Sequence, residues 1–219
     1  MKNLRIDIVS DVMCPWCVIG YNNLKQALEL LKTQSNDDIN SEIHWLPFEL
    51  NPNMPQQGQN LAEHLQEKYG STPEQSQEVR ERISSLGEEL GFVFNFHNDM
   101  KIYNTFNAHQ LLHWAGTISA SAQTEFKQAL FSAYFTDGQD VSNKEILLSV
   151  VEKVSLDREQ AEKIINSQTH AEEVRALQSQ WHQVGINSVP TFIFNQKYMV
   201  SGGQPAENFV NILKDIIAE

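Results

Sequence analysis

Cys14-Pro15-Trp16-Cys17 lies between an apolar run over residues 4–10 and a helical pattern that begins near Val18. These two cysteines are the only ones in the chain. On the first turn of a helix this spacing keeps both sulfurs within reach of a disulfide. Peptide N–H groups at a helix start carry partial positive charge, which favours thiolate over thiol and lowers a cysteine pKa. The motif therefore predicts a redox-active dithiol.

Two other interpretations of the cysteines stay open. A Cys-x-x-Cys pair can be half of a structural zinc site, but that site needs two further ligands at matching spacing. The chain has no second cysteine pair, and the nearest histidine downstream is His44. Two buried, inert cysteines would rarely fall at this spacing directly after a strand. The redox interpretation is the favoured one.

Length and charge limit the classes of protein. The 219 residues can bury a sizeable core as one large domain or two small ones. A formal net charge of −12 argues against nucleic-acid partners, which need clustered Lys and Arg. No basic segment leads into an apolar signal stretch, and no run of about 18 apolar residues could span a bilayer. We therefore expect a cytoplasmic protein with no membrane partner, and in that compartment an isolated Cys-x-x-Cys is more often catalytic than structural.

Hydrophobic periodicity predicts a strand–helix–strand unit at the start of the chain. Residues 4–10 and 43–48 are expected strands, and leucines at helical spacing predict a helix over 15–32. A crossover of this length joins parallel strands. Asp11, in the loop before the cysteines, is at least as well suited to capping the helix as to a catalytic role.

Residues 60–184 have an almost wholly helical pattern with several start signals. The expected helix starts are Asn60 with Glu63, Thr72-Pro73, Ser142 with Glu145, and Thr169 with Glu172.

After Gly185 the strand signal returns. Residues 191–194 and 197–200 are expected to form a hairpin around Asn195-Gln196, and Pro205 opens a last helix. Without the helical segment the order is β-α-β followed by β-β-α. The predicted fold class is therefore α/β, a thioredoxin fold with a large α-helical insertion. Its expected domains are a discontinuous thioredoxin-like domain (1–55 and 185–219) and an inserted α-helical subdomain (56–184).

Ser188-Val189-Pro190-Thr191 is a second candidate site. A proline at the first residue of a strand can simply protect a sheet edge. The functional interpretation is a cis Val189-Pro190 bond, which base rates alone do not favour. The cis bond is favoured by the family resemblance that these residues and the cysteine motif carry together.

The chain resembles the DsbA-like thioredoxin-fold family and, within it, the FrnE-like cytosolic branch. The stretches that carry the resemblance are Ser10-Asp11-Val12-Met13-Cys14-Pro15-Trp16-Cys17, Pro47-Phe48-Glu49-Leu50-Asn51-Pro52, Asn104-Thr105-Phe106-Asn107-Ala108-His109 and Gly185-Ile186-Asn187-Ser188-Val189-Pro190-Thr191-Phe192.

The resemblance implies a role for each part of the site. Cys14 would be the exposed nucleophile and Cys17 the resolving thiol. Val189-Pro190 would be a cis-proline loop that lies against Cys14 and offers backbone groups to an extended substrate peptide. The helical insertion would cap the cysteines and shape the substrate groove.

Two departures limit what can be carried over. Thioredoxin relatives commonly keep a buried acid six residues before the first cysteine, where this chain has Ile8. Asp7 is one residue away, and in a strand it points to the opposite face. The dipeptide between the cysteines lacks the histidine that makes periplasmic DsbA strongly oxidising, so no such potential is inferred.

Further candidate residues lie near the motif. His109 and His113 are four apart on one helical face, which permits metal binding in principle. No carboxylate or thiol is visibly placed to complete such a site, so no metal is predicted. His109 is expected to line the groove over Cys14. Trp16 is expected either to contact substrate or to pack on the insertion.

The predicted activity is thiol–disulfide exchange by a protein disulfide reductase or isomerase. Its expected substrates are disulfide-containing proteins or small thiols, and its partner is a cellular thiol reductant, with glutathione as a candidate. No cofactor is expected beyond the Cys14–Cys17 disulfide. The alternatives are a glutathione-dependent isomerase or transferase of the kappa-class-like branch, whose members typically have serine where Cys14 stands, and a peptide-binding chaperone. The oligomeric state stays open.

Overall fold

The computed structural model describes residues 2–34 and 39–218. Its main sheet has the strand order β2-β1-β5-β6. The strands are β1 (Lys2–Ser10), β2 (Ile39–Pro47), β5 (Thr191–Phe194) and β6 (Tyr198–Ser201). β1 runs parallel to β2 and antiparallel to β5, and β5 runs antiparallel to β6. This is the expected β-α-β and β-β-α arrangement, so the predicted thioredoxin fold with a helical insertion is confirmed.

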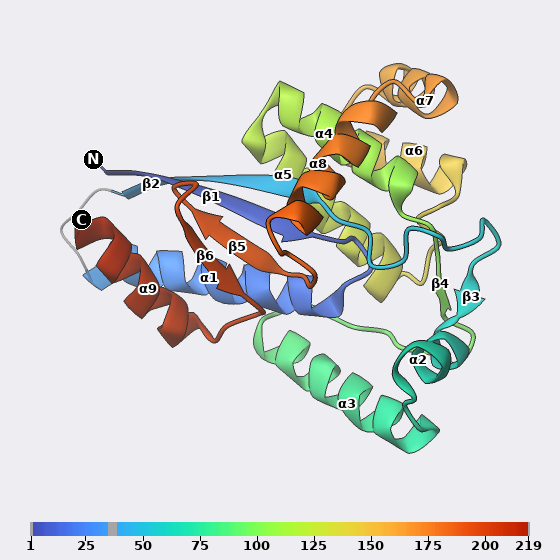
Figure 1. Ribbon diagram of the computed structural model, residues 1–219, viewed down its shortest axis with the longest axis horizontal. Helices are drawn as coiled ribbons and strands as arrows, with labels where there is room; N and C mark the ends of the chain where they lie inside the picture. Colours follow the sequence, from blue (N-terminus) through green and yellow to red (C-terminus); the bar gives the residue numbers. More distant parts are fainter. Residues whose placement is uncertain (1, 35–38, 219) are drawn as a thin grey trace.

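Helices cover both faces of this sheet (Figure 1). α1 (Pro15–Gln34) and α9 (Ala206–Ala218) pack against each other on one face. α4 (Phe106–Ile118) and α8 (Ala171–Gln183) lie on the opposite side, where both contact β2. The cysteine motif therefore lies where β1 meets α1, at the boundary between the sheet and the helical insertion.

The remaining elements belong to the segment between β2 and β5. They are α2 (Leu61–Tyr69), α3 (Pro73–Glu89), α5 (Ala120–Phe131), the π-helical turn η1 (Ser132–Thr136), α6 (Lys144–Lys153), α7 (Arg158–Ser167), and a two-stranded ribbon of β3 (Gln59–Asn60) and β4 (Lys101–Ile102). α3 contacts α1. The domain boundaries at residues 55–56 and 184–185 stay a prediction.

The edge of β2 is covered by α5. The side-chain amide of Gln123 accepts a hydrogen bond from the Trp45 backbone N–H at 2.8 Å and donates one to the Trp45 carbonyl at 2.9 Å. A free strand edge exposes such groups, and pairing them removes a site of unwanted strand addition. The same contact fixes α5 against the sheet. Lys127, one turn further along α5, is thereby brought towards the cysteine motif.

Two of the four predicted helix starts are confirmed. The Asn60 side chain accepts hydrogen bonds from the first turn of α2. Thr72 begins α3 with Pro73 in the first turn, and its capping box uses Gln75.

The other two helix starts are each displaced by one residue. Asn143 caps α6 because the Ser142 hydroxyl already donates to Asp140 at 2.6 Å. His170 stands at the cap position of α8, with no side-chain cap hydrogen bond, where Thr169 was expected.

The C-terminal hairpin differs from the prediction by one residue. Phe194 pairs with Tyr198, so three residues rather than two connect the strands. Asn195 and Gln196 both have positive φ angles, 49° and 56°. Asparagine accepts this backbone region more readily than most residues, which explains why the turn forms without glycine.

Within the described residues, no helix combines the length and the apolar composition needed to cross a bilayer.

Candidate active site

The two cysteines lie at the start of α1 and are both free thiols. The Cys14 N–H donates to the Asp11 carbonyl at 3.4 Å, and the Cys17 N–H donates to the Cys14 carbonyl at 3.0 Å. These bonds form the tight turn into the helix. Cys17 is fully buried, whereas Cys14 keeps 3% of its surface exposed. Cys14 is therefore buried rather than exposed as expected, although its residue lines the groove described below, and Cys17 lies behind it.

The loop before β5 reaches Cys14. The Val189–Pro190 peptide bond is cis, as predicted. The Cys14 thiol donates to the Val189 carbonyl at 3.5 Å. α1 must approach this loop closely, because a Cβ on Gly20 would come within 3.2 Å of Pro190 and 3.0 Å of Gly203. A glycine in α1 thus allows the loop to lie against the cysteine.

A largely apolar groove of about 650 Å³ begins at Cys14. Its thioredoxin-like side includes Trp16 and Val189, and its helical side includes residues of α2, α3 and η1. The apolar and aromatic residues that line its helical side include Leu61, Leu65, Tyr69, Val79, Ile83, Tyr134 and Phe135. Trp16 is only partly buried, lines this groove and also packs against the core. The two expectations for Trp16 are therefore compatible.

Asp11 points into the protein rather than towards the helix start. One carboxylate oxygen accepts a hydrogen bond from the Leu50 N–H at 2.7 Å, and the other lies 3.3 Å from Nε2 of His109. Burial tends to raise the pKa of Asp11, but the His109 hydrogen bond and charge and the Leu50 N–H outweigh burial and lower it. The alternative that Asp11 caps the following helix is replaced by this contact with His109.

His109 does not line the groove as expected. It is 1% exposed and faces Asp11 from α4. The physical reason is that its face of α4 packs on the sheet, so a buried carboxylate rather than the groove is its neighbour.

Lys127 is a component of the site that the sequence did not indicate. It is 1% exposed, and its Nζ lies 5.4 Å from the ring centre of Trp45 and 4.9 Å from that of Phe131. Burial lowers the pKa of Lys127 to about 8, although the nearby thiols and Asp11 act in the opposite direction. In the sequence it resembles the other charged residues of helices that face solvent.

A small cavity lies beside these buried groups. Its volume is about 10 Å³, and its lining includes Trp45, His109, His113 and Lys127. A cavity of about 10–15 Å³ has room for one water molecule when polar partners are present. The imidazole and ammonium groups supply such partners.

The pair of thiols carries its first negative charge on the buried sulfur. The hydrogen bond with Cys17, followed by burial, raises the pKa of Cys14 well above the usual value. Burial tends to raise the pKa of Cys17 as well, but the hydrogen bond with Cys14, the Lys127 charge and the Ser10 hydroxyl outweigh burial and lower it. The two thiols thus titrate as a unit. The helix start alone had suggested a lowered cysteine pKa without indicating which sulfur would hold the charge.

Fold and site together define a class: thioredoxin-fold proteins with a dithiol at the start of the first helix and a cis-proline loop beside it. The model of the DSBA-like thioredoxin domain family matches residues 5–214. The chain belongs to this family, as the resemblance predicted.

Individual relatives agree over nearly the whole length. The YwbO protein of Bacillus subtilis (strain 168) is 25% identical over 213 residues, which is 97% of this chain and 96% of that protein. The crystal structure of the probable DsbA oxidoreductase SCO1869 from Streptomyces coelicolor has a TM-score of 0.86 and 28% identity, covering 99% of this chain and 91% of that one. The family match and the SCO1869 structure support an enzyme of the oxidoreductase type.

The cytosolic disulfide reductase DsbM from Pseudomonas aeruginosa, in its structure with GSH, shares the fold. The TM-score is 0.61 at 14% identity, with 98% of this chain and 100% of that chain covered.

Proposed function

We propose that the protein is a thiol–disulfide oxidoreductase that reduces or isomerises disulfides through Cys14 and Cys17. One observation carries the proposal: Cys14 lies at the end of an apolar groove against the Val189 carbonyl, with the Cys17 thiol buried directly behind it. An extended peptide in the groove would place a disulfide sulfur near Cys14. Backbone groups of the Val189-Pro190 loop are available to orient that peptide.

The reaction begins when the Cys14 thiol turns its proton from the Val189 carbonyl towards Cys17 and passes it to the Cys17 thiolate. The resulting Cys14 thiolate attacks one sulfur of the substrate disulfide, forms a mixed disulfide and releases the other substrate sulfur as a thiolate. Cys17 then passes its proton to the substrate thiolate released first and attacks Cys14, which releases the second substrate sulfur as a thiolate. The substrate gains two electrons, and the Cys14–Cys17 disulfide forms.

The groups behind the cysteines assist the proton steps. The Lys127 ammonium stabilises a thiolate on Cys17 by charge, and the low dielectric of the interior strengthens that effect. The Asp11 carboxylate acts in the opposite sense on Cys14. Together they favour a charge held at Cys17 until the substrate arrives.

A cellular thiol would restore the reduced pair. The fold is shared with a cytosolic disulfide reductase whose structure was determined with GSH, which supports glutathione as the reductant, the reducing direction and a cytoplasmic location as parts of the proposal. No cofactor is proposed beyond the redox-active disulfide. The inserted segment 56–184 would serve as the groove wall over the cysteines.

Cysteine variants test the mechanism. Cys14→Ser should reduce the rate of disulfide reduction by at least about 10³-fold, because the attacking group is lost. Cys17→Ser should accumulate a mixed disulfide with substrate, visible as a mass increase that a reductant reverses. The reduction potential, measured in glutathione buffers, should lie below about −200 mV.

The alternative functions predict different outcomes for these experiments. Full turnover in Cys17→Ser would favour the glutathione-dependent isomerase or transferase, which needs no resolving thiol. Peptide binding that survives loss of both thiols, without any exchange activity in the parent protein, would favour the chaperone. A potential near about −120 mV would reverse the direction of the reaction.

A further inference from the structure

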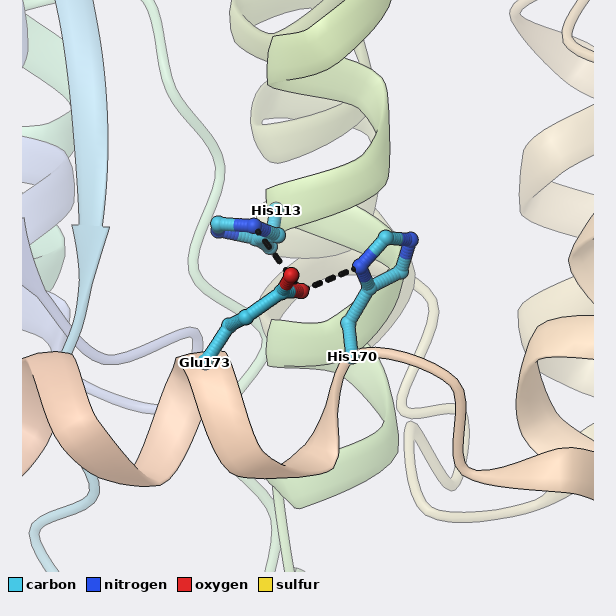
Figure 2. Close-up of side chains that lie close together, drawn as sticks. All are labelled: His113, His170 and Glu173. Carbon is cyan, nitrogen blue, oxygen red and sulfur yellow. Dashed lines mark hydrogen bonds and ion pairs between the residues drawn. The ribbon is translucent and has the colours of Figure 1, made fainter.

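Three potential metal ligands meet where α4 contacts α8. His113 comes from α4, His170 stands directly before α8, and Glu173 lies in the first turn of α8. Figure 2 shows both imidazole rings directed at the same carboxylate. Nδ1 of His170 is 2.6 Å from Oε2 of Glu173, and Nε2 of His113 is 3.5 Å from the same oxygen.

The partners of His113 differ from those considered in the sequence. The sequence pattern paired His113 with His109 at helical spacing, and no carboxylate was visibly placed to complete a metal site. The folded chain turns His109 inward to Asp11, whereas His113 meets a second imidazole and a carboxylate from a distant segment. The three ligand atoms lie within 4.8 Å of one another.

We propose that His113, His170 and Glu173 form a binding site for a divalent transition-metal ion of the zinc type, with solvent as the fourth ligand. Two imidazoles and one carboxylate are a donor set that zinc accepts, and three protein ligands leave one position open. This site lies outside the cysteine pair and does not depend on the proposed redox function.

The geometry is close to that of a zinc site but must adjust when an ion binds. Tetrahedral zinc with bonds of about 2.0–2.2 Å places its ligand atoms roughly 3.3 Å apart. The His113–Glu173 distance of 3.5 Å already matches, and the His170–Glu173 distance of 2.6 Å must open. The Glu173 side chain is 59% exposed and can rotate to do so. The ligand nitrogens of the two imidazoles lie within 4.8 Å of each other, and rotation of these partly exposed rings would set their separation.

The charges around the site are suited to a cation. The start of α8 carries the positive end of its helix dipole, which disfavours a cation. Glu172 and Glu173 in the first turn offset that effect.

A metal ion at this position would crosslink α4 and the start of α8. α8 ends at Gln183, shortly before the loop that carries the cis Val189–Pro190 bond. Gln178 of the same helix donates to Glu49 at 3.1 Å. We therefore expect the ion to stabilise the packing of the helix that leads into the cis-proline loop.

The test is a titration with Zn²⁺ alone by isothermal calorimetry. It uses Cys14→Ser/Cys17→Ser as the parent, since thiolates would bind zinc themselves. The expected result is one Zn²⁺ per chain and a higher thermal midpoint with zinc. His170→Ala and Glu173→Gln should each weaken binding by at least about 10-fold, the lower end of the loss seen for outer-shell partners.

His44→Ala is the matched control. His44 and Glu42 form a 3.1 Å pair of one imidazole and one carboxylate, so its loss should leave zinc binding unchanged. Circular dichroism with a chelator present shows whether His170→Ala and Glu173→Gln are folded, and the second variant alters a side chain that is 59% exposed. The proposal is overturned if the parent binds no zinc, if His170→Ala and Glu173→Gln bind zinc like the parent, or if His44→Ala loses as much affinity.

Discussion

The two sides of the cysteine pair differ in almost every physical respect. The groove side, formed by Trp16, Val189 and the apolar residues of α2, α3 and η1, is open and largely uncharged. The interior side, formed by Asp11, His109 and Lys127, is buried and ionisable. Substrate recognition and control of the thiol proton are thus assigned to opposite sides of one dithiol.

This separation explains how the site can lack an acidic residue six positions before the first cysteine. Ile8, at that position, is fully buried and apolar. Asp7 points elsewhere and forms an ion pair with Arg5 at 2.9 Å. The charges near the thiols come instead from the loop residue Asp11 and from Lys127 of the inserted α5. The helical segment therefore supplies part of the interior side as well as the groove wall.

Among changes to the residues on either side of the cysteines, the largest effect is expected from Lys127→Met, which removes the cation from the interior side. Disulfide reduction at pH 7 should slow by about 10-fold, the effect of losing a charge interaction of about 1.4 kcal/mol on a rate. The free energy of unfolding should rise. The fall in the Lys127 pKa from 10.5 to about 8 on folding corresponds to a cost of about 3 kcal/mol for burying the charged side chain, and the cation–π contacts offset roughly 1–2 kcal/mol of it.

The pH dependence has a defined sign. The unfolded chain holds the extra proton of Lys127 between pH 8 and pH 10.5, so the unfolding free energy of the parent rises with pH across this range. Lys127→Met should lack that rise when denaturant unfolding is measured in a cysteine-free background. Lys163→Met, an exposed lysine, serves as the control. Equal reduction rates in Lys127→Met and the parent would remove Lys127 from the site.

Asp11→Asn should have a smaller effect, and its effect on the thiol pKa should be opposite in sign to that of Lys127→Met. Loss of this carboxylate should lower the pKa of Cys14, because its charge raises that pKa, and thiolate absorbance against pH measures the change. The fold should lose about 1–3 kcal/mol. Because the pKa of Asp11 is lowered below 3.8, its contribution is present above that pH and is lost as the pH falls through the folded-state pKa.

Asp7→Asn is the matched control for this prediction. Asp7 is also buried and also ion-paired, but its partner is Arg5 and it is not among the groups that shift the pKa of either thiol. It should cost stability without moving the thiol titration. Identical thiol titrations in Asp11→Asn, Asp7→Asn and the parent would mean that the interior side does not tune the cysteines.

The groove side could be predicted from the sequence much better than the interior side. The cysteine spacing and the strand patterns are local, so they indicated the dithiol and the β-α-β unit correctly. The cis Val189–Pro190 bond was predicted from the family resemblance rather than from a local pattern, and it is present. Lys127 could not be found in this way, because a lysine in a helix is indistinguishable from a solvated one until Gln123 is seen to fix α5 against β2.

The second limit on prediction from the sequence was the orientation of side chains. His109 was identified from its motif but assigned to the groove, because sequence spacing gives the face of a helix and not the neighbour of that face. The displaced caps of α6 and α8 have a similar cause: Ser142 satisfies Asp140 rather than the helix, a choice that depends on local geometry.

The smallest effect is expected on the groove side, from Val79→Ser. Val79 is 50% exposed on α3, so the change should leave the fold intact. Partial burial of this side chain by a bound peptide would contribute roughly 0.5–1 kcal/mol, so KM for a protein disulfide should rise about 2- to 5-fold. A small disulfide that reaches Cys14 without covering α3 should keep its KM, and kcat should be unchanged for both. Val93→Ser, equally exposed at 54% but outside the groove, should behave like the parent. If Val79→Ser altered kcat or the thiol titration instead of KM, the two sides of the dithiol would not be separate.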